Sequence, residues 1–225
     1  KIKTVVKRVN QPDKMTLHRL KARELEEQGD IGGAIEQVRL ALRHKPNASR
    51  LIRILGLLHF KIKKDKIAEK CLLKAASVNK QDTITRAHLA RYYLRNNMLE
   101  TAGKYYLEIL TLSVRYNDEA VEIARKLMLD QSRQMAMRLF SKVIVRSKKQ
   151  NARREQIIDI CLELNEFEFP LRLLEESIKE NPSNYDMVYK LGIVALECGD
   201  IEKAMTNFLL VDRNVRSNID AKFNI

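Results

Sequence analysis

Four histidines and three cysteines are the side chains in this sequence best suited to metal binding or nucleophilic catalysis. They form no HExxH or CxxC pair and no other metal-ligand spacing. The sequence also lacks a GxSxG turn, a Walker A loop and a GxGxxG motif. The pattern therefore predicts a protein that is not an enzyme and that needs no cofactor or metal. The residues concerned are His18, His44, His59, His88, Cys71, Cys161 and Cys198.

One glycine-rich stretch looks at first like a phosphate-binding loop, within "LEEQGDIGGAIEQVRLALRHKPN", residues 25–47. Its glycine spacing does not fit such a loop. A turn between two helices explains it better, because Gly29 can end one helix in a left-handed conformation and Asp30 can cap the next. Pro46 would then stop the second helix. The stretch predicts two helices joined by a short turn.

The same pattern returns along the chain at a constant interval of 34 positions. The pattern occurs six times, and its first position holds a small residue in five of the six copies. Twelve positions later comes a second, mostly small residue, and four positions after that a larger apolar one. Small residues allow two antiparallel helices to approach closely, and the larger residue fills the space between neighbouring units. The first set is Ala22, Gly56, Ala90, Ala124, Ile158 (the exception) and Gly192; the second is Ala34, Ala68, Ala102, Ala136, Pro170 and Ala204; the third is Val38, Leu72, Tyr106, Phe140, Leu174 and Phe208.

This period and these positions resemble the tetratricopeptide repeat family, whose unit is a 34-residue helix–turn–helix. Pro46 and Pro182 fall on the position where the family has proline, and Pro170 falls in the first turn of a helix, where no hydrogen bond is lost. The resemblance implies an all-α fold, a right-handed α-solenoid of in-phase repeats covering residues 15–218. The six repeats are 15–48, 49–82, 83–116, 117–150, 151–184 and 185–218.

The two ends of the chain lie outside these six repeats. Residues 1–14 begin with "KIKTVVKRV", whose apolar positions predict a short amphipathic helix. It would either cap the first repeat or link to a preceding domain, and it resembles the last helix of a response-regulator receiver domain. In phase, residues 219–225 would start a seventh repeat or form a truncated cap. Because the sequence starts at Lys1, we expect it to be a piece of a longer protein.

The charge is unevenly distributed along a chain with a net charge of +13. Residues 1–150 hold 33 basic and 15 acidic residues, a net +18, whereas residues 151–225 hold 9 and 14, a net −5. No run approaches eighteen apolar residues, which argues against a membrane-spanning helix. The scattered, unpaired cysteines favour a reducing compartment, so we expect a cytoplasmic protein.

In tetratricopeptide repeats the first helices line a concave groove, and the resemblance implies which side chains face it. In repeats 1–4 these positions are basic, and in the last two repeats they are acidic. Arginines bind carboxylates through two parallel hydrogen bonds, so an acidic or extended segment of a protein partner is the expected ligand; the alternative is that these are ordinary solvated charges. The basic residues are Arg19, Arg23, Arg50, Arg53, Lys61, His88, Arg91, Arg95 and Arg125. The acidic residues are Glu155, Asp159, Glu163, Asp186 and Glu197.

The family's carboxylate clamp for chaperone tails is not reproduced. At its five positions stand Arg19, Arg23, Ile54, Ile84 and His88, of which only Arg19 keeps the charge like for like. A protein-interaction scaffold within a larger signalling protein is therefore the predicted function. Two alternatives remain: nucleic-acid binding, against which stand the few aromatic residues and the acidic last repeats, and self-association through the terminal repeat.

Overall fold

The computed structural model describes residues 13–147 and 149–223, with side chains up to residue 214. These residues form helices joined by short turns, and no strand occurs within them. The bounds follow the predicted alternation of first and second helices. The helices are α1 Lys14–Glu27, α2 Ile31–His44, α3 Ser49–Lys61, α4 Asp65–Val78, α5 Thr83–Arg95, α6 Leu99–Leu112, α7 Asn117–Leu129, α8 Arg133–Arg146, α9 Gln150–Glu163, α10 Glu168–Glu180, α11 Tyr185–Glu197 and α12 Ile201–Phe223.

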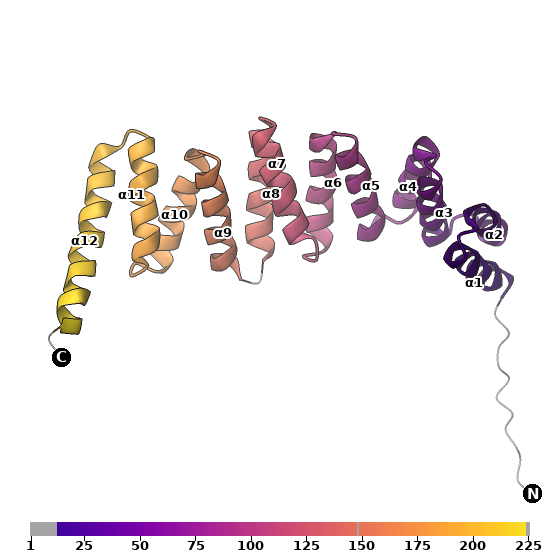
Figure 1. Ribbon diagram of the computed structural model, residues 1–225, viewed down its shortest axis with the longest axis horizontal. Helices are drawn as coiled ribbons and strands as arrows, with labels where there is room; N and C mark the ends of the chain where they lie inside the picture. Colours follow the sequence, from indigo (N-terminus) through magenta and orange to yellow (C-terminus); the bar gives the residue numbers. More distant parts are fainter. Residues whose placement is uncertain (1–12, 148, 224–225) are drawn as a thin grey trace, which may run out of the picture. The chain divides into compact units, whose positions relative to one another are not determined.

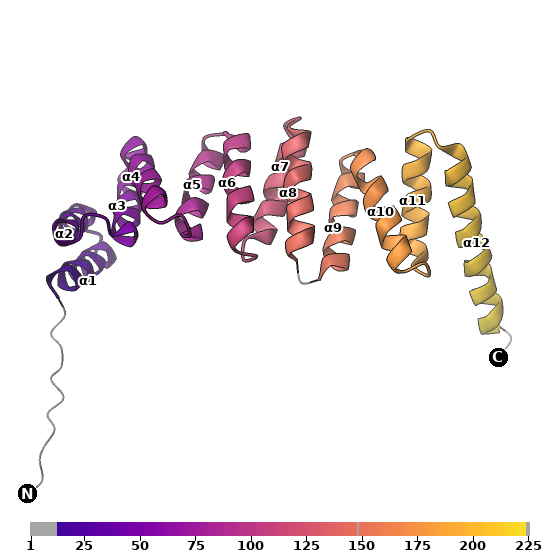
Figure 2. The ribbon, with the colours of Figure 1, turned by 180° about the vertical axis from the view of Figure 1, so that it is seen from behind.

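The helices group into two compact units, which are described separately. Unit 1 is Lys1–Met98 and holds α1 to α5; unit 2 is Leu99–Ile225 and holds α6 to α12. Within each unit every helix packs against the next one along the chain, and in unit 2 α6 also packs against α8. Figures 1 and 2 show this succession from opposite sides. The architecture within each unit is that of an all-α helical repeat.

The turn inside each helix pair repeats with the same period as the sequence pattern. Each turn contains one residue with positive φ, between 54° and 85°, and consecutive ones are one full repeat period apart. Only two of the six are glycine, although a left-handed conformation costs other residues free energy. The six residues are Gly29, Lys63, Asn97, Gln131, Asn165 and Gly199.

The small residues of the repeat pattern are buried, as the pattern predicts. Both sets of small positions, the exception Ile158 included, are buried in the structure. Gly192 shows why size matters there, because an added Cβ would lie 2.5 Å from a ring carbon of Phe208. In unit 1 the small residues Ala22 and Ala34 belong to one buried core cluster, together with the larger Val38.

The helix ends also follow from the residues at them. Asp30 accepts a hydrogen bond from Gly33 N at 2.8 Å and Asp200 one from Lys203 N at 3.0 Å, so both cap a second helix. Pro170 is the third residue of α10, within the first turn, where its missing N–H has no helical partner to lose.

The two predicted end segments have different outcomes. The amphipathic helix expected at residues 1–14 falls almost wholly on residues 1–12, outside the described part of the chain. In the structure α12 runs without a turn from Ile201 to Phe223, so residues 219–223 continue the second helix of the last pair. The sequence after Val211 contains neither Gly nor Pro to end the helix. The start of a seventh repeat and a truncated cap both stay predictions for residues 219–225.

Candidate protein-binding site

Four of the basic residues predicted to line the groove come together in one pocket of unit 1. Arg19 and Arg23 lie on α1, and Arg50 and Lys61 lie on α3. The pocket between these two first helices has a volume of about 430 Å³. Apolar side chains complete its lining: Leu20, Ala22, Val38 and Ile54.

The four cations of this pocket differ in their partners. Arg23 forms an ion pair with Glu27 at 2.8 Å, and Lys61 forms one with Glu26 at 2.7 Å. Arg19 and Arg50 form no ion pair with any residue that the structure describes. Among the described residues, the pocket therefore offers two guanidinium groups that form no ion pair with a carboxylate, beside an apolar floor.

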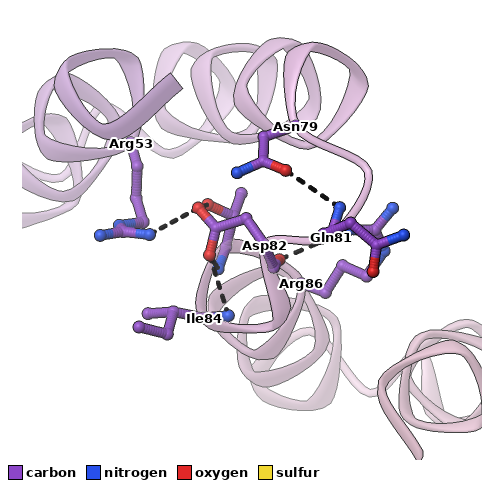
Figure 3. A network of polar contacts seen from close by, with 7 residues as sticks. Arg53, Asn79, Gln81, Asp82, Ile84 and Arg86 are labelled. Carbon is purple, nitrogen blue, oxygen red and sulfur yellow. Dashed lines mark hydrogen bonds and ion pairs between the residues drawn. The ribbon is translucent and has the colours of Figure 1, made fainter. Parts of the chain in front are cut away.

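Arg53, which was also predicted to line the groove, is not among the residues that line this pocket. Its Nη1 donates to Asp82 Oδ2 at 2.5 Å, and the two side chains are only 15% and 9% exposed. Asp82 also caps α5, accepting from the backbone N of Ile84 and Thr85 at 3.1 and 3.2 Å. Figure 3 shows Arg53 reaching from its helix to this carboxylate. This cation joins α3 to the start of α5 and is structural.

The network around Asp82 also sets the charge of its carboxyl group. Burial acts to raise the pKa of Asp82, but hydrogen bonds from the Thr85 hydroxyl and N–H and the charge of Arg53 outweigh it and hold this pKa below its ordinary value. The carboxylate therefore stays ionised and keeps its hold on Arg53. Nothing in the charge count singled out Asp82, but an Asp directly before a helix that begins Thr-Ile-Thr is a readable N-cap signal.

The remaining predicted cations have other surroundings. The guanidinium of Arg95 lies over the Phe60 ring, 5.2 Å from its centre. His88 and Arg91 lie on α5 and have interaction partners of their own. Arg125 lies on α7 of unit 2, where it pairs with Glu163 at 2.9 Å. None of these residues lines the unit 1 pocket.

The acidic positions predicted for the last two repeats are also partly paired. Asp159 and Asp186 both contact Lys190 Nζ, at 2.8 and 2.9 Å. Burial acts to lower the pKa of Lys190, but hydrogen bonds and charge from the two carboxylates outweigh it and raise this pKa above its usual value. Glu155 accepts a hydrogen bond from the Asn184 amide at 3.5 Å.

The residues with metal-binding or nucleophilic chemistry are dispersed. No group of three His, Cys, Asp or Glu side chains suited to a metal occurs among the residues described. His59 is 3% exposed, and burial, helped by the charges of Arg39 and Lys64, lowers its pKa. Burial raises the pKa of the Cys161 thiol to about 12, so this thiol is a poor nucleophile. In the described part of the chain no helix has the length and apolar character needed to cross a membrane.

Comparison with solved structures identifies the class of fold to which these paired helices belong. A tetratricopeptide repeat protein from Parabacteroides merdae is similar over 89% of this chain and 79% of its own, with 17% identity and a TM-score of 0.54. Pseudomonas aeruginosa PilF (14% identity, 93% and 97% covered, TM-score 0.49) and the type IV pilus biogenesis factor PilW (10%, 92% and 96%, 0.48) also match. Neither a protein-family model nor a curated protein matches the sequence.

The fold therefore defines a helical repeat protein. More narrowly, it is the tetratricopeptide-repeat fold that the 34-residue period predicts. At so low a sequence identity the similarity concerns the fold alone, so the ligand has to be inferred from the surface of this chain.

Proposed function

We propose that the protein is a non-catalytic scaffold that binds an acidic, extended segment of a partner protein at the first-helix pocket of unit 1. One observation carries the proposal: Arg19 and Arg50 lie in the same pocket with no ion pair of their own among the described residues. Leaving two cations without partners is useful when a ligand supplies the anions.

The pocket chemistry favours a peptide with carboxylates flanking an apolar side chain. A guanidinium presents a planar fork that matches the two oxygens of a carboxylate. The apolar floor, with Val38 and Ile54, would bury one side chain between those contacts. Glu26 and Glu27 hold Lys61 and Arg23, so the acidic residues of the ligand would be directed to Arg19 and Arg50.

The wider setting is also part of the proposal. Cys71, Cys161 and Cys198 are free thiols, which fits a reducing compartment such as the cytoplasm. A pocket for a charged segment suits a regulatory module of a larger signalling protein. Catalysis is not part of the proposed function, since no described residue partners the buried His59 or Cys161 as a general base or a nucleophile would require.

Fluorescence polarisation with a labelled ten-residue peptide of Asp and Glu around two leucines tests the proposal. The double variant R19E/R50E should weaken binding at least tenfold, because two attractive contacts become repulsive. The matched control is K66E/K70E, which makes the same change of charge on exposed residues of α4 outside the pocket. Equal weakening by both variants would show general charge attraction and contradict a binding pocket.

A further inference from the structure

A second hollow lies in unit 2, on the side formed by second helices. It has a volume of about 670 Å³, within the range of about 300–1,000 Å³ typical of ligand pockets. Its lining comes from α6, α8 and α10, which are the second helices of consecutive helix pairs. This groove shares no residue with the unit 1 pocket. None of the residues that the sequence predicted for the concave groove of the first helices lines it.

Helix α8 forms the floor of the groove with one continuous stripe. Gln134, Met137, Arg138, Ser141, Lys142 and Val145 follow at spacings of three, one, three, one and three residues, which is one face of an α-helix. The opposite face of α8, with Leu139, Phe140 and Val143, is buried in the core. The stripe is therefore the outward face of a helix whose inward face already has its packing partners.

Part of this stripe is apolar and open to solvent. Val145 is 69% exposed, although burial of an apolar side chain is favourable. Met137 precedes it by eight positions on the same stripe, and Leu107 of α6 and Phe169 of α10 form the flanks. Methionine adapts its shape to a partner, which makes it frequent in protein-binding grooves.

Three cations surround this apolar part. Arg138 and Lys142 lie four residues apart on α8, and Arg172 faces them from α10. Like charges at this spacing on a helix are unfavourable. None of the three forms an ion pair within the described residues, and no carboxylate lines the groove itself. An anionic partner would remove a repulsion that the chain leaves uncompensated.

We propose that this groove binds an amphipathic α-helix of a partner protein, with apolar residues on one face and Glu or Asp beside them. The apolar face would cover Val145 and Met137, and the flanking carboxylates would contact Arg138, Lys142 and Arg172. An open groove between helices, with a floor that repeats every three to four residues, matches the spacing of anchors on a helix. The inference is independent of the unit 1 pocket.

The lining argues against a nucleic acid as the occupant. Single-stranded nucleic acids bind through bases that stack on exposed aromatic rings. Phe169 is the aromatic residue of this lining and is buried, so its ring face is not available for stacking. The exposed apolar side chain of Val145 also has no role in contacting phosphates.

A helical peptide of leucine and glutamate, stapled and fluorescently labelled, with all leucines on one face, is the probe for this groove. We expect micromolar binding to the whole chain. The triple variant R138E/K142E/R172E should weaken it at least tenfold, and V145D should weaken it about fivefold. The variant R19E/R50E should leave it unchanged, which separates this inference from the function proposed for unit 1. Circular dichroism confirms that the variants stay helical.

Several results would overturn the inference. One is no binding of the peptide, and another is equal binding of a peptide with the same residues in scrambled order. The same holds if the triple variant binds as tightly as the original chain. Two alternative ligands are a 20-nucleotide polyuridylate and anionic phospholipid vesicles. If one of them binds the original chain in place of the peptide but does not bind the triple variant, the groove binds another class of ligand. A dimer in sedimentation that V145D dissolves would assign it to a second copy of the chain.

Discussion

The pocket of unit 1 and the groove of unit 2 both contain several cations, yet the cations differ in how they are held. In unit 1, Glu26 and Glu27 neutralise two of the four, and a fifth predicted cation, Arg53, is tied to Asp82. In unit 2, Arg138, Lys142 and Arg172 have no carboxylate partner in the described residues. The net charge of a segment therefore does not show which of its cations are paired within the fold. We propose that this pairing, and not the net charge, decides where a ligand binds.

The largest expected effect comes from removing the buried pairing in unit 1. Asp82→Ala should lower the free energy of unfolding by about 3 kcal/mol, because it leaves the partly buried guanidinium of Arg53 without its carboxylate and removes the cap of α5. Urea denaturation followed by circular dichroism measures this. Adding Arg53→Met to Asp82→Ala should recover part of the loss. No loss in the single variant would mean that this pair is not structural.

A smaller effect, seen as a pH dependence of stability, is expected from His59, because burial disfavours the charged form of its side chain in the folded state. Its pKa is lowered on folding, so the unfolded chain binds the proton more readily, and stability should fall as the pH drops through the ordinary value of about 6.5. Denaturation at several pH values on both sides of that value measures the slope. His59→Leu should flatten it, and an unchanged slope in this variant would assign the effect to other groups.

The turns allow a direct comparison of the two units. Lys63→Gly in unit 1 and Gln131→Gly in unit 2 should each stabilise the chain by about 1 kcal/mol, because both residues have a left-handed conformation that glycine adopts without strain. Asn97→Gly is the matched control and should gain less, since asparagine tolerates this conformation. Thermal unfolding provides the readout. A loss of stability in the glycine variants would contradict the assigned turn geometry.

The smallest effect is expected from an exposed ion pair of unit 2. Glu163→Gln should change stability by less than about 0.5 kcal/mol, although its partner Arg125 lies 2.9 Å away. The same denaturation assay as for Asp82 measures it. A loss close to that of Asp82→Ala would show that exposure does not separate structural from surface pairs in this molecule.

Much of the fold could be predicted because its determinants are local. The period of small residues and the helix caps required only residue types and spacing. The left-handed conformation of Lys63 and Gln131 could not be read from those residues alone, since neither favours it. It follows only from their position in the repeat, because each lies a whole number of periods from Gly29 and Gly199.

The candidate site was less predictable from the sequence. Whether a cation is available to a ligand depends on the contacts that its side chain makes with the next repeat. Arg19 and Arg53 occupy the same position within the first and the second repeat, so both were expected to line the groove. Arg53 finds Asp82 at the end of its repeat, whereas the residue at the end of the first repeat is Ala48, so Arg19 has no such partner. The sequence contained this difference, but only the fold shows that these positions meet.

The most direct test of the account uses both peptides against both charge-reversal variants in one polarisation experiment. We predict that R19E/R50E loses the extended acidic peptide and keeps the amphipathic helix, and that R138E/K142E/R172E does the reverse. If either variant weakens both peptides equally, overall charge governs binding. That result would contradict the claim that unpaired cations define two separate sites.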